Sequence, residues 1–254
     1  MKALQCTSFG GPEKLEFNEI AIHLRGENEG IIAVKACSVN FPDSLIIQNL
    51  YQFKPELPFT PGSDVAGIVK EVGEGVSHLK VGQEVFGFVA HGGLAEEVLV
   101  PANACFPKPP QMDFPTAASF LMAYGTSYHA LKDRGRLAKG ETLLVLGASG
   151  GVGLAAVELG KLMGAQVIAA ASTDDKLALC KEYGADKTIN YTTQDKVMSL
   201  PDTSPRKQMH TRKITCEGYL REDGLWDIDA ELSDCKHYDF DNHDFGIIVA
   251  GKPY

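Results

Sequence analysis

The sequence predicts an α/β protein in which a β-rich unit is followed by part of a doubly wound parallel sheet. From Met1 to about Pro110 the chain consists of short strand-like runs broken by Gly, Pro and Asn, a pattern typical of an irregular β-barrel or sandwich. From Glu141 to Tyr191 apolar strands alternate with helices, as in β–α–β units. After Tyr191 the chain turns polar and then strand-like again.

Composition and charge narrow the classes of function. The chain has 254 residues, of which 44% are hydrophobic, enough for one large or two modest domains. The net charge of -9 and the lack of a long Lys/Arg run argue against a nucleic-acid or anionic membrane surface and favour a small-molecule partner. The start carries no signal-peptide pattern, and no apolar run approaches the ~20 residues that span a bilayer, so we expect a soluble, cytoplasmic protein.

The six cysteines lie far apart, without a CxxC pair. This spacing favours neither a disulfide framework nor a structural zinc site, and most of them are interpreted as buried thiols. They are Cys6, Cys37, Cys105, Cys180, Cys216 and Cys235.

Strands and helices can be assigned along the chain from its sequence pattern. In the first unit, strand-like runs at 31–40, 65–73 and 96–101 are bounded by turn residues. Helix-compatible residues at 114–137 then predict one or two connecting helices. The next five segments predict strand, helix, strand, helix and strand, at 142–147, 152–164, 166–171, 174–185 and 187–191.

Four segments are expected. They are a first β-type domain, a partial cofactor domain, a polar linker and a β-type tail, at 1–125, 126–191, 192–209 and 210–254. In the tail, strand-like residues on both sides of Glu222-Asp223-Gly224 could form a hairpin. Between Asp234 and Asp244 lies an acidic, His-containing cluster, which is interpreted as a solvated charge run rather than a divalent-cation site.

The strongest chemical signal is the run GASGGVG at 147–153, directly after an apolar strand and directly before an apolar-faced helix. Glycines here allow a tight turn, let the backbone approach a pyrophosphate and permit close packing of strand and helix. The helix N-terminus adds unpaired N–H groups and partial positive charge. The context favours dinucleotide binding over a purely structural turn.

The end of the second strand favours NADP(H) over NAD(H). NAD enzymes usually place an acid about 20 residues after the first glycine, but the stretch 169–173 has none. Ser172 can donate to a 2′-phosphate and Lys176 can neutralise it. The alternative is that Lys176 is only a solvated helix residue, with Asp174 and Asp175 weakening the positive field.

Six motifs in order resemble the quinone oxidoreductase branch of the medium-chain dehydrogenase/reductase superfamily over residues 1–191. The resemblance implies a GroES-like β-barrel domain followed by a Rossmann domain. The motifs are SVNFPD, LPFTPGSDVAGIV, VGQEVFGF, GGLAEEVLVP, YGTSYHAL and GASGGVG.

The same resemblance implies chemistry without zinc. In zinc-dependent relatives the positions that match Asn40 and Ser63 hold a metal-binding Cys and His, and Asp64 stands where they have Glu. An amide and a hydroxyl are poor zinc ligands beside thiolate and imidazole. The expected reaction is direct hydride transfer from NADPH to a quinone or an α,β-unsaturated carbonyl acceptor.

The resemblance also implies the site residues. Asn40 and Tyr51 would be catalytic, lining the acceptor site and donating to the developing oxyanion. Asn40 also suits a simple turn, Tyr51 could be an ordinary half-buried aromatic, and Thr126 could cap a helix. His91 and His129 are interpreted as structural. The expected cofactor-binding residues are Thr126, Ser149, Gly150, Gly151, Val152, Ser172, Lys176 and Tyr191.

Two features depart from the family pattern. Ile47-Gln48-Asn49 stands where the family often has Arg and Gly, so acceptor selectivity is not predicted. The C-terminal half of the cofactor domain, with three of its six strands, is not recognisable. A half sheet would leave an open edge, and the possible homodimer through this domain loses its usual edge.

The tail from 210 onwards resembles the beginning of a bacterial domain family of unknown function, through a Gly-Tyr, an Arg and the string Asp-Gly-Leu-Trp-Asp-Ile. A fused or truncated chain is the favoured interpretation, and a lineage-specific C-terminus packed on the remaining sheet is the alternative. Two functions therefore stay open: a working reductase, or a non-catalytic remnant that is at most a weak nucleotide-binding or interaction module.

Overall fold

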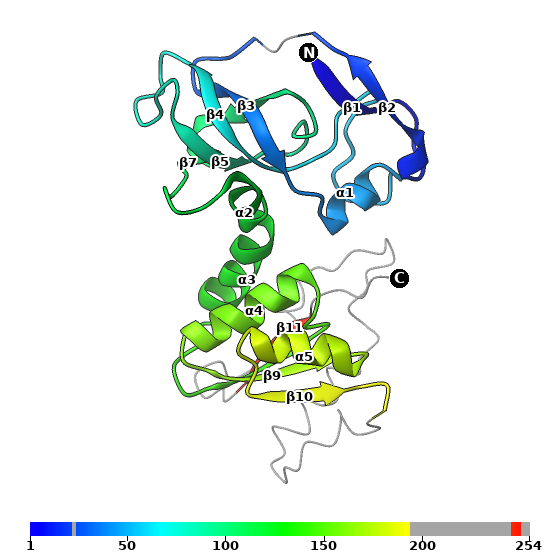
Figure 1. Cartoon of the computed structure of the whole chain (residues 1–254), viewed down its shortest axis with the longest axis vertical. Helices are drawn as coiled ribbons and strands as arrows, with labels where there is room; N and C mark the ends of the chain where they lie inside the picture. Colours follow the sequence, from blue (N-terminus) through cyan, green and yellow to red (C-terminus); the bar gives the residue numbers. More distant parts are fainter. Residues whose placement is uncertain (22–23, 194–244, 250–254) are drawn as a thin grey trace. The chain divides into compact units, whose positions relative to one another are not determined.

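The computed structural model describes residues 1–21, 24–193 and 245–249. The chain forms two compact units, Met1–Gly125 and Thr126–Tyr254 (Figure 1). In the part that the structure describes, no helix is long and apolar enough to cross a membrane. The polar linker, the hairpin expected around Glu222 and the acidic cluster ending at Asp244 lie outside the described residues, apart from 192–193 of the linker.

The first unit is built on antiparallel strands. A five-stranded sheet has the order β6-β3-β4-β5-β7, and β1 pairs with β2 in a separate ladder. The described strands leave the larger sheet open between β6 and β7, so the closed barrel expected from the resemblance is not formed by this hydrogen-bonded sheet. The strands are β1 Lys2–Cys6, β2 Leu15–Glu19, β3 Glu29–Cys37, β4 Asp64–Val72, β5 Glu84–Phe88, β6 Glu97–Pro101 and β7 Cys105–Pro107.

Alternating apolar residues of these strands form the core of the first unit. Val65 and Val69 on β4 pack with Val85 on β5 and Val98 on β6, and all four are almost completely buried. A short helix α1, Phe41–Ile46, precedes β4. The single-turn segments η1 and η2 cover Pro12–Lys14 and Ala102–Ala104, and the connecting helical segments are α2 Phe114–Ala118 and η3 Leu121–Gly125.

The second unit is a parallel sheet with the strand order β10-β9-β8-β11. The strands β8, β9 and β10 fall where the sequence predicted them, at Thr142–Leu146, Gln166–Ala171 and Lys187–Asn190. The helical segments are α3 Thr126–Tyr128, η4 His129–Arg134, α4 Gly151–Leu162 and α5 Asp174–Glu182. All three ladders of the sheet are parallel.

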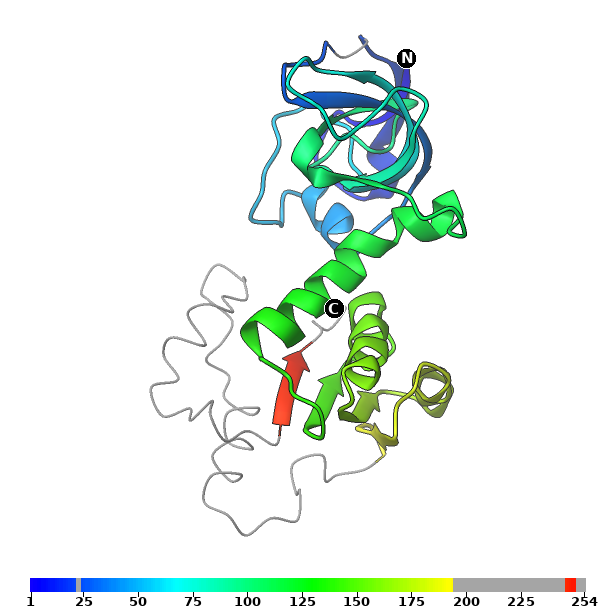
Figure 2. The same ribbon diagram turned by 90° about the vertical axis from the view of Figure 1, so that its left-hand side faces the viewer.

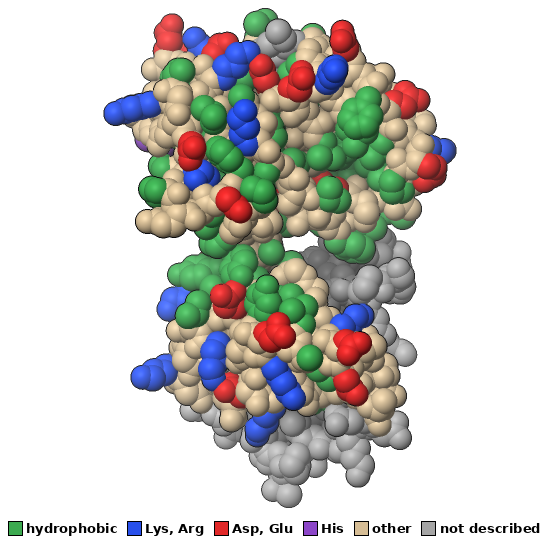
Figure 3. Space-filling view, viewed as in Figure 1, with side chains coloured by type: hydrophobic (Ala, Val, Ile, Leu, Met, Phe, Trp, Pro, Cys, Tyr) green, Lys and Arg blue, Asp and Glu red, His purple; other side chains and the backbone are tan. Residues whose placement is uncertain are grey.

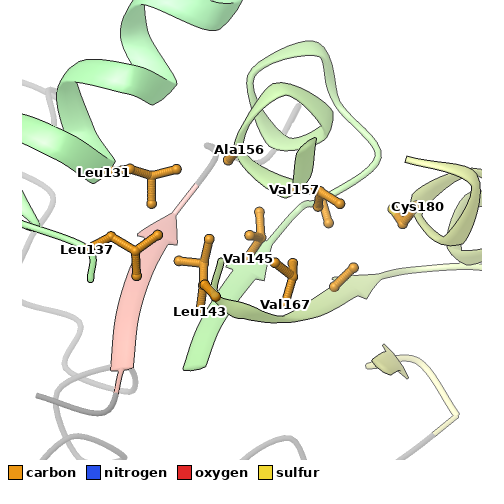
Figure 4. Packing of buried hydrophobic residues seen from close by; sticks show 11 residues of the cluster. Leu131, Leu137, Leu143, Val145, Ala156, Val157, Val167 and Cys180 are labelled. Carbon is orange, nitrogen blue, oxygen red and sulfur yellow. The ribbon is translucent and has the colours of Figure 1, made fainter. Parts of the chain in front are cut away.

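β8 is buried on both faces. Leu143 and Val145 are inaccessible and pack in one cluster with Val157 of α4 and Cys180 of α5 (Figure 4). Leu144, one residue out of phase, belongs to a second cluster on the opposite face. Because successive side chains of a strand point to opposite faces, such a continuous apolar run is typical of an interior parallel strand.

The fourth strand of this sheet comes from the tail. β11, Phe245–Val249, pairs in parallel with β8 (Figure 2). The sequence indicated only three strands for this sheet, with a tail unrelated to it as the favoured interpretation and a C-terminus packed on the sheet as the alternative. The structure instead adds part of the tail on the side of β8 opposite to β9.

Candidate functional site

The glycine-rich turn joins the end of β8 to the start of α4, and three of its glycines differ in role. Gly147 has φ +63°, a left-handed conformation that favours glycine. A Cβ on Gly153 would lie 2.6 Å from the carbonyl oxygen of Gly147, so the helix and the turn pack too closely for a side chain. A Cβ on Gly151 would have no heavy atom within 4 Å. Gly151 therefore leaves open space beside the backbone.

The N-terminus of α4 presents backbone donors at this turn. The helix begins at Gly151 with Gly150 as its N-cap, and Leu154 donates to the carbonyl of Gly150 at 2.7 Å. The N–H groups of Gly151, Val152 and Gly153 precede this bond and have no partner within the helix. Together with the helix dipole they can bind an anionic group such as a pyrophosphate.

Ser127 anchors the start of α4 from the preceding helical segment. Its side chain is completely buried and its hydroxyl donates to the carbonyl of Val152 at 2.7 Å. The neighbouring Thr126, which the sequence analysis singled out, is exposed at the start of α3. Ser149 lies half-buried in the turn itself. Sequence reasoning missed Ser127, whose only signal was its position beside Thr126.

A second corner forms where β9 ends. Lys176 Nζ donates to Ser172 Oγ at 3.2 Å, and Tyr191 N donates to the carbonyl of Ala171 at 3.2 Å. Tyr191 is 40% exposed, and Lys176 is exposed as well. The structure thus places Ser172, Lys176 and Tyr191 around one strand end.

The acid nearest this corner has a partner of its own. Asp174 Oδ1 accepts from Asn190 Nδ2 at 2.8 Å. Thr192 also belongs to the corner, because its hydroxyl donates to the carbonyl of Ser172 at 2.9 Å. Neither Asn190 nor Thr192 was expected from the sequence, since each contact joins segments that are separated by a helix and a strand.

The glycine turn and this corner share one edge of the sheet. Ala148 N donates to the carbonyl of Ala170 at 3.0 Å, which joins the turn directly to the end of β9. In an open α/β sheet, ligands bind outside the carboxyl ends of the parallel strands. An anion-binding turn and a Ser/Lys pair on adjacent strand ends are suited to the pyrophosphate and the 2′-phosphate of one dinucleotide.

In the first unit, Asn40 is fixed at the start of α1. Its Nδ2 donates to Ser38 Oγ at 2.8 Å and its backbone N donates to Asp43 Oδ2 at 2.7 Å. Asp43 Oδ1 accepts from Gly62 N at 3.1 Å, which joins this helix to the segment before β4. One of the two amide hydrogens of Asn40 is used by Ser38, so the amide can donate a second hydrogen bond.

Tyr51 is half-buried and packs against an apolar cluster that includes Ile46, Ile47 and Phe59. The structure does not record a hydrogen bond or other contact that places its hydroxyl beside Asn40. The two residues lie in the same unit, Met1–Gly125.

Two buried carboxyl groups, Asp43 and Asp64, belong to the same unit as Asn40, and Asp43 accepts a hydrogen bond from the backbone N–H of Asn40. Asp43 is 4% exposed and Asp64 is 1% exposed. Burial raises the pKa of Asp43, and burial raises the pKa of Asp64 to about 6 despite a 2.7 Å hydrogen bond from Met122 N. The other oxygen of Asp64 is buried without a hydrogen-bond partner. Nearby, burial and these two carboxylates raise the pKa of the Cys37 thiol to about 12, so it is protonated near neutral pH.

The positions that match metal ligands in zinc-dependent relatives have other partners. Ser63 is buried and its hydroxyl donates to the carbonyl of Ala90 at 3.3 Å. Within residues 1–21, 24–193 and 245–249 no group of three or more His, Cys, Asp or Glu side chains is arranged to hold a metal ion.

The two histidines that the sequence analysis set aside both have contacts. His91 stacks on Phe53 with ring centroids 5.9 Å apart and meets the edge of Phe59 at 6.1 Å. His129 Nδ1 lies 2.9 Å from a carboxylate oxygen of Asp133 one helical turn away, and both side chains are exposed.

Comparison with family models divides the chain in three. Residues 26–110 match the alcohol dehydrogenase GroES-like domain, and residues 151–208 match a family described as zinc-binding dehydrogenase. Residues 210–254 match a protein family of unknown function (DUF2889). β11 therefore lies within the last match.

Two curated relatives match most of the chain. The chain is 40% identical over 206 residues to quinone oxidoreductase-like protein 2 homolog of Nematostella vectensis, covering 79% of this chain and 56% of that protein. It is 39% identical to quinone oxidoreductase of Rattus norvegicus, covering 75% of this chain and 59% of that protein. The chain thus spans less than three fifths of the length of these relatives.

Solved structures of quinone oxidoreductases have a fold similar to that of this chain. A quinone oxidoreductase of Escherichia coli complexed with NADPH superposes with a TM-score of 0.73 at 33% identity, covering 77% of this chain and 60% of that one. The quinone oxidoreductase of Thermus thermophilus, described with its NADPH complex, gives a TM-score of 0.66 at 37% identity, covering 74% and 59%.

Proposed function

Since residues 1–191 belong to the quinone oxidoreductase branch of the medium-chain dehydrogenase/reductase superfamily, we propose that this chain is an NADPH-dependent reductase of quinones or α,β-unsaturated carbonyl compounds. The observation that carries the proposal is the shared carboxyl edge of β8 and β9, where the glycine turn and the Ser172–Lys176 pair lie on adjacent strand ends.

Each part of this edge has a proposed task in NADPH binding. The amides at the start of α4 receive the pyrophosphate, and the open space at Gly151 lets it approach the backbone. Ser172 donates to the 2′-phosphate, while Lys176 supplies its counter-charge. Thr126, Ser149, Gly150 and Val152 complete the proposed set around the turn, and Tyr191 completes it at the 2′-phosphate corner.

The 2′-phosphate is preferred over a free ribose hydroxyl because the corner offers the cation of Lys176, and no acid stands at 169–173, where NAD enzymes usually place one. The carboxylate of Asp174 already accepts from the amide of Asn190. A dinucleotide that lacks the 2′-phosphate would give Lys176 no anionic partner, so one charge-assisted hydrogen bond would be lost.

The acceptor is proposed to bind in the first unit, beside Asn40 and Tyr51. The side chains next to them in sequence are apolar yet exposed: Val39 at 75%, Phe41 at 55% and Leu50 at 62%. Exposed hydrophobic side chains are visible among charges of both signs on the surface of this unit (Figure 3). An uncharged, ring-containing acceptor suits such a surface better than a charged one.

Bound NADPH supplies the hydride, and the protein's task is to orient the acceptor and stabilise the charge that develops on it. The second amide hydrogen of Asn40 and the Tyr51 hydroxyl are the proposed donors to the acceptor oxygen. The proposal involves no zinc, because Asn40 and Ser63, at the positions that match metal ligands in zinc-dependent relatives, offer an amide and a hydroxyl, and the Ser63 hydroxyl already donates to a carbonyl.

The test is a fluorescence titration of the purified chain with NADPH and NADH. We expect saturable binding that prefers NADPH, and Lys176→Ala should weaken NADPH binding about tenfold while leaving NADH binding unchanged. Lys181→Ala, an exposed lysine of the same helix, is the matched control and should bind both as the wild type does. Equal affinity of Lys176→Ala for NADPH would remove the 2′-phosphate assignment. Absence of binding of either dinucleotide would leave the alternative of a non-catalytic module.

A further inference from the structure

The tail strand β11 occupies a specific place in the cofactor sheet. It runs parallel to β8 in an unbroken register that pairs Phe245 with Thr142 and Val249 with Leu146. β8 thereby becomes an interior strand, with β9 on one side and β11 on the other.

The burial of β8 is what an interior strand requires. Leu143, Leu144 and Val145 are each 4% exposed or less, although successive residues face opposite sides of the sheet. An edge position would leave one row of backbone N–H and C=O groups of this apolar strand unpaired. β11 supplies the partners for that row.

The packing beside β11 also indicates that β8 is an interior strand. Leu131 and Leu137, from the segment that precedes β8, lie next to β11 in the cluster that covers this face of the sheet (Figure 4). They are 2% and 5% exposed. The sequence of β11, Phe-Gly-Ile-Ile-Val, is an apolar run rich in β-branched residues, a composition typical of strands in parallel sheets.

We infer that β11 serves as the fourth strand of the cofactor sheet, so that a segment matching a different protein family completes the edge at which the dinucleotide binds. The ligand half of this inference rests on the proposed function. A doubly wound sheet binds its ligand where the strand order reverses, which in this sheet is between β8 and β11.

The direction of β11 is what makes it part of the site. Because β11 is parallel to β8 and Val249 pairs with Leu146, the carboxyl end of β11 lies level with the residue just before Gly147. An antiparallel strand would close the edge equally well but would bring its amino end to the glycine turn. The parallel register therefore assigns the wall of the site opposite β9 to the carboxyl end of β11.

The register can be tested by disulfide trapping in the full-length chain. Directly paired residues of adjacent strands have Cα atoms within the range that a disulfide spans. The pair Thr142→Cys with Phe245→Cys should cross-link on mild oxidation, and mass spectrometry of the digested protein should identify the joined peptides despite the native cysteines. The control pair Thr142→Cys with Val249→Cys is offset by four residues, about 13 Å along the strand, and should not cross-link.

The control pair also reports strand direction, because an antiparallel β11 would place position 249 opposite position 142. Preferential cross-linking of the control pair, or cross-linking of neither pair in folded protein, would overturn the inference.

If either double variant fails to fold, the melting temperatures of Ile247→Pro and Ile248→Pro replace the disulfide experiment. Adjacent residues of a strand direct their N–H groups to opposite edges, so one proline removes a bond to β8 and the other does not. A lowered melting temperature for one of the two supports the inference, and wild-type stability of both overturns it.

NADPH titration of the same proteins separates the two proposals. Cross-linking at 142–245 together with NADPH affinity that falls at least tenfold in the destabilised proline variant supports both. Cross-linking without NADPH binding by the wild type supports the strand assignment and overturns the proposed function. NADPH affinity unchanged in that proline variant overturns the assignment of β11 to the binding edge.

Discussion

Replacing Gly153 by alanine tests whether the glycine turn and α4 are packed as closely as the structure shows. The new Cβ would lie 2.6 Å from the carbonyl oxygen of Gly147 and 2.8 Å from the Cα of Ala148. Both are backbone atoms, so no side chain can rotate away and the turn or the helix has to move by several tenths of an ångström.

Overpacking of this kind costs about 1–3 kcal/mol, and alanine recovers about 0.5–1 kcal/mol because it has less backbone entropy to lose in a helix than glycine. Subtracting the midpoints of these two ranges gives a net loss of about 1 kcal/mol for Gly153→Ala. For a chain of this size each kcal/mol lowers the melting temperature by about 2–4 °C. Thermal unfolding followed by circular dichroism should therefore show a decrease of roughly 2–4 °C.

Gly151→Ala is the matched control, two residues away in the same helix. Its Cβ meets no atom within 4 Å, so the melting temperature should stay unchanged or rise slightly. The same methyl group would occupy the space proposed for the pyrophosphate, so NADPH binding should weaken at least tenfold. Wild-type stability of Gly153→Ala would refute the close approach of helix and turn. Wild-type NADPH affinity of Gly151→Ala would refute the placement of the pyrophosphate.

Three further substitutions probe other parts of the molecule. The folded-state pKa of Asp64, about 6, lies above its unfolded value near 4, so the protein should lose stability as pH rises from about 4 to 6, and Asp64→Asn should flatten this part of the curve of melting temperature against pH. A slope unchanged by the substitution would assign the effect to Asp43, whose pKa burial also raises. Asn40→Ala should lower kcat for quinone reduction about 100-fold with little change in NADPH affinity, and a wild-type kcat would exclude Asn40 as the oxyanion donor. Ser127→Ala leaves the Val152 carbonyl without its buried donor and should lower stability by about 1 kcal/mol, whereas an unchanged melting temperature would show that this bond contributes nothing net.

The strand, turn and helix of the proposed cofactor site could be predicted from the sequence because their signals are local. The strand, the glycine turn and the helix after it are contiguous, and the end of β9 follows within one further helix and strand. Periodicity and glycine spacing therefore make Gly150 and Gly151 candidates, and the lack of an acid at the end of the second strand makes Lys176 one, without knowledge of long-range contacts. Asn40 and Tyr51 carry no such local signal, and only the family resemblance pointed to them.

The polar contacts that support the site could not be predicted in the same way. The hydrogen bond from Ser127 to Val152 joins α3 to α4, with η4 and β8 between them in sequence. The hydrogen bond from Asn190 to Asp174 joins the end of β10 to the start of α5. Such pairs depend on where the backbone brings side chains together, which composition and period do not specify. The same holds for the opening between β6 and β7, because the strand pattern indicates a barrel-like unit but not which edges pair.

The tail strand shows the limit of sequence patterns most directly. A run of five apolar residues indicates a buried strand, but it does not indicate the sheet, the neighbour or the direction. Those follow from the rest of the chain: β8 offers an apolar strand with one unpaired edge, and a parallel neighbour needs a connection of about a dozen residues or more. The segment between Asn190 and Phe245 far exceeds that length. A strand of different family origin can therefore complete the sheet, because pairing with β8 requires a strand-forming segment and a long enough connection, and not a particular sequence.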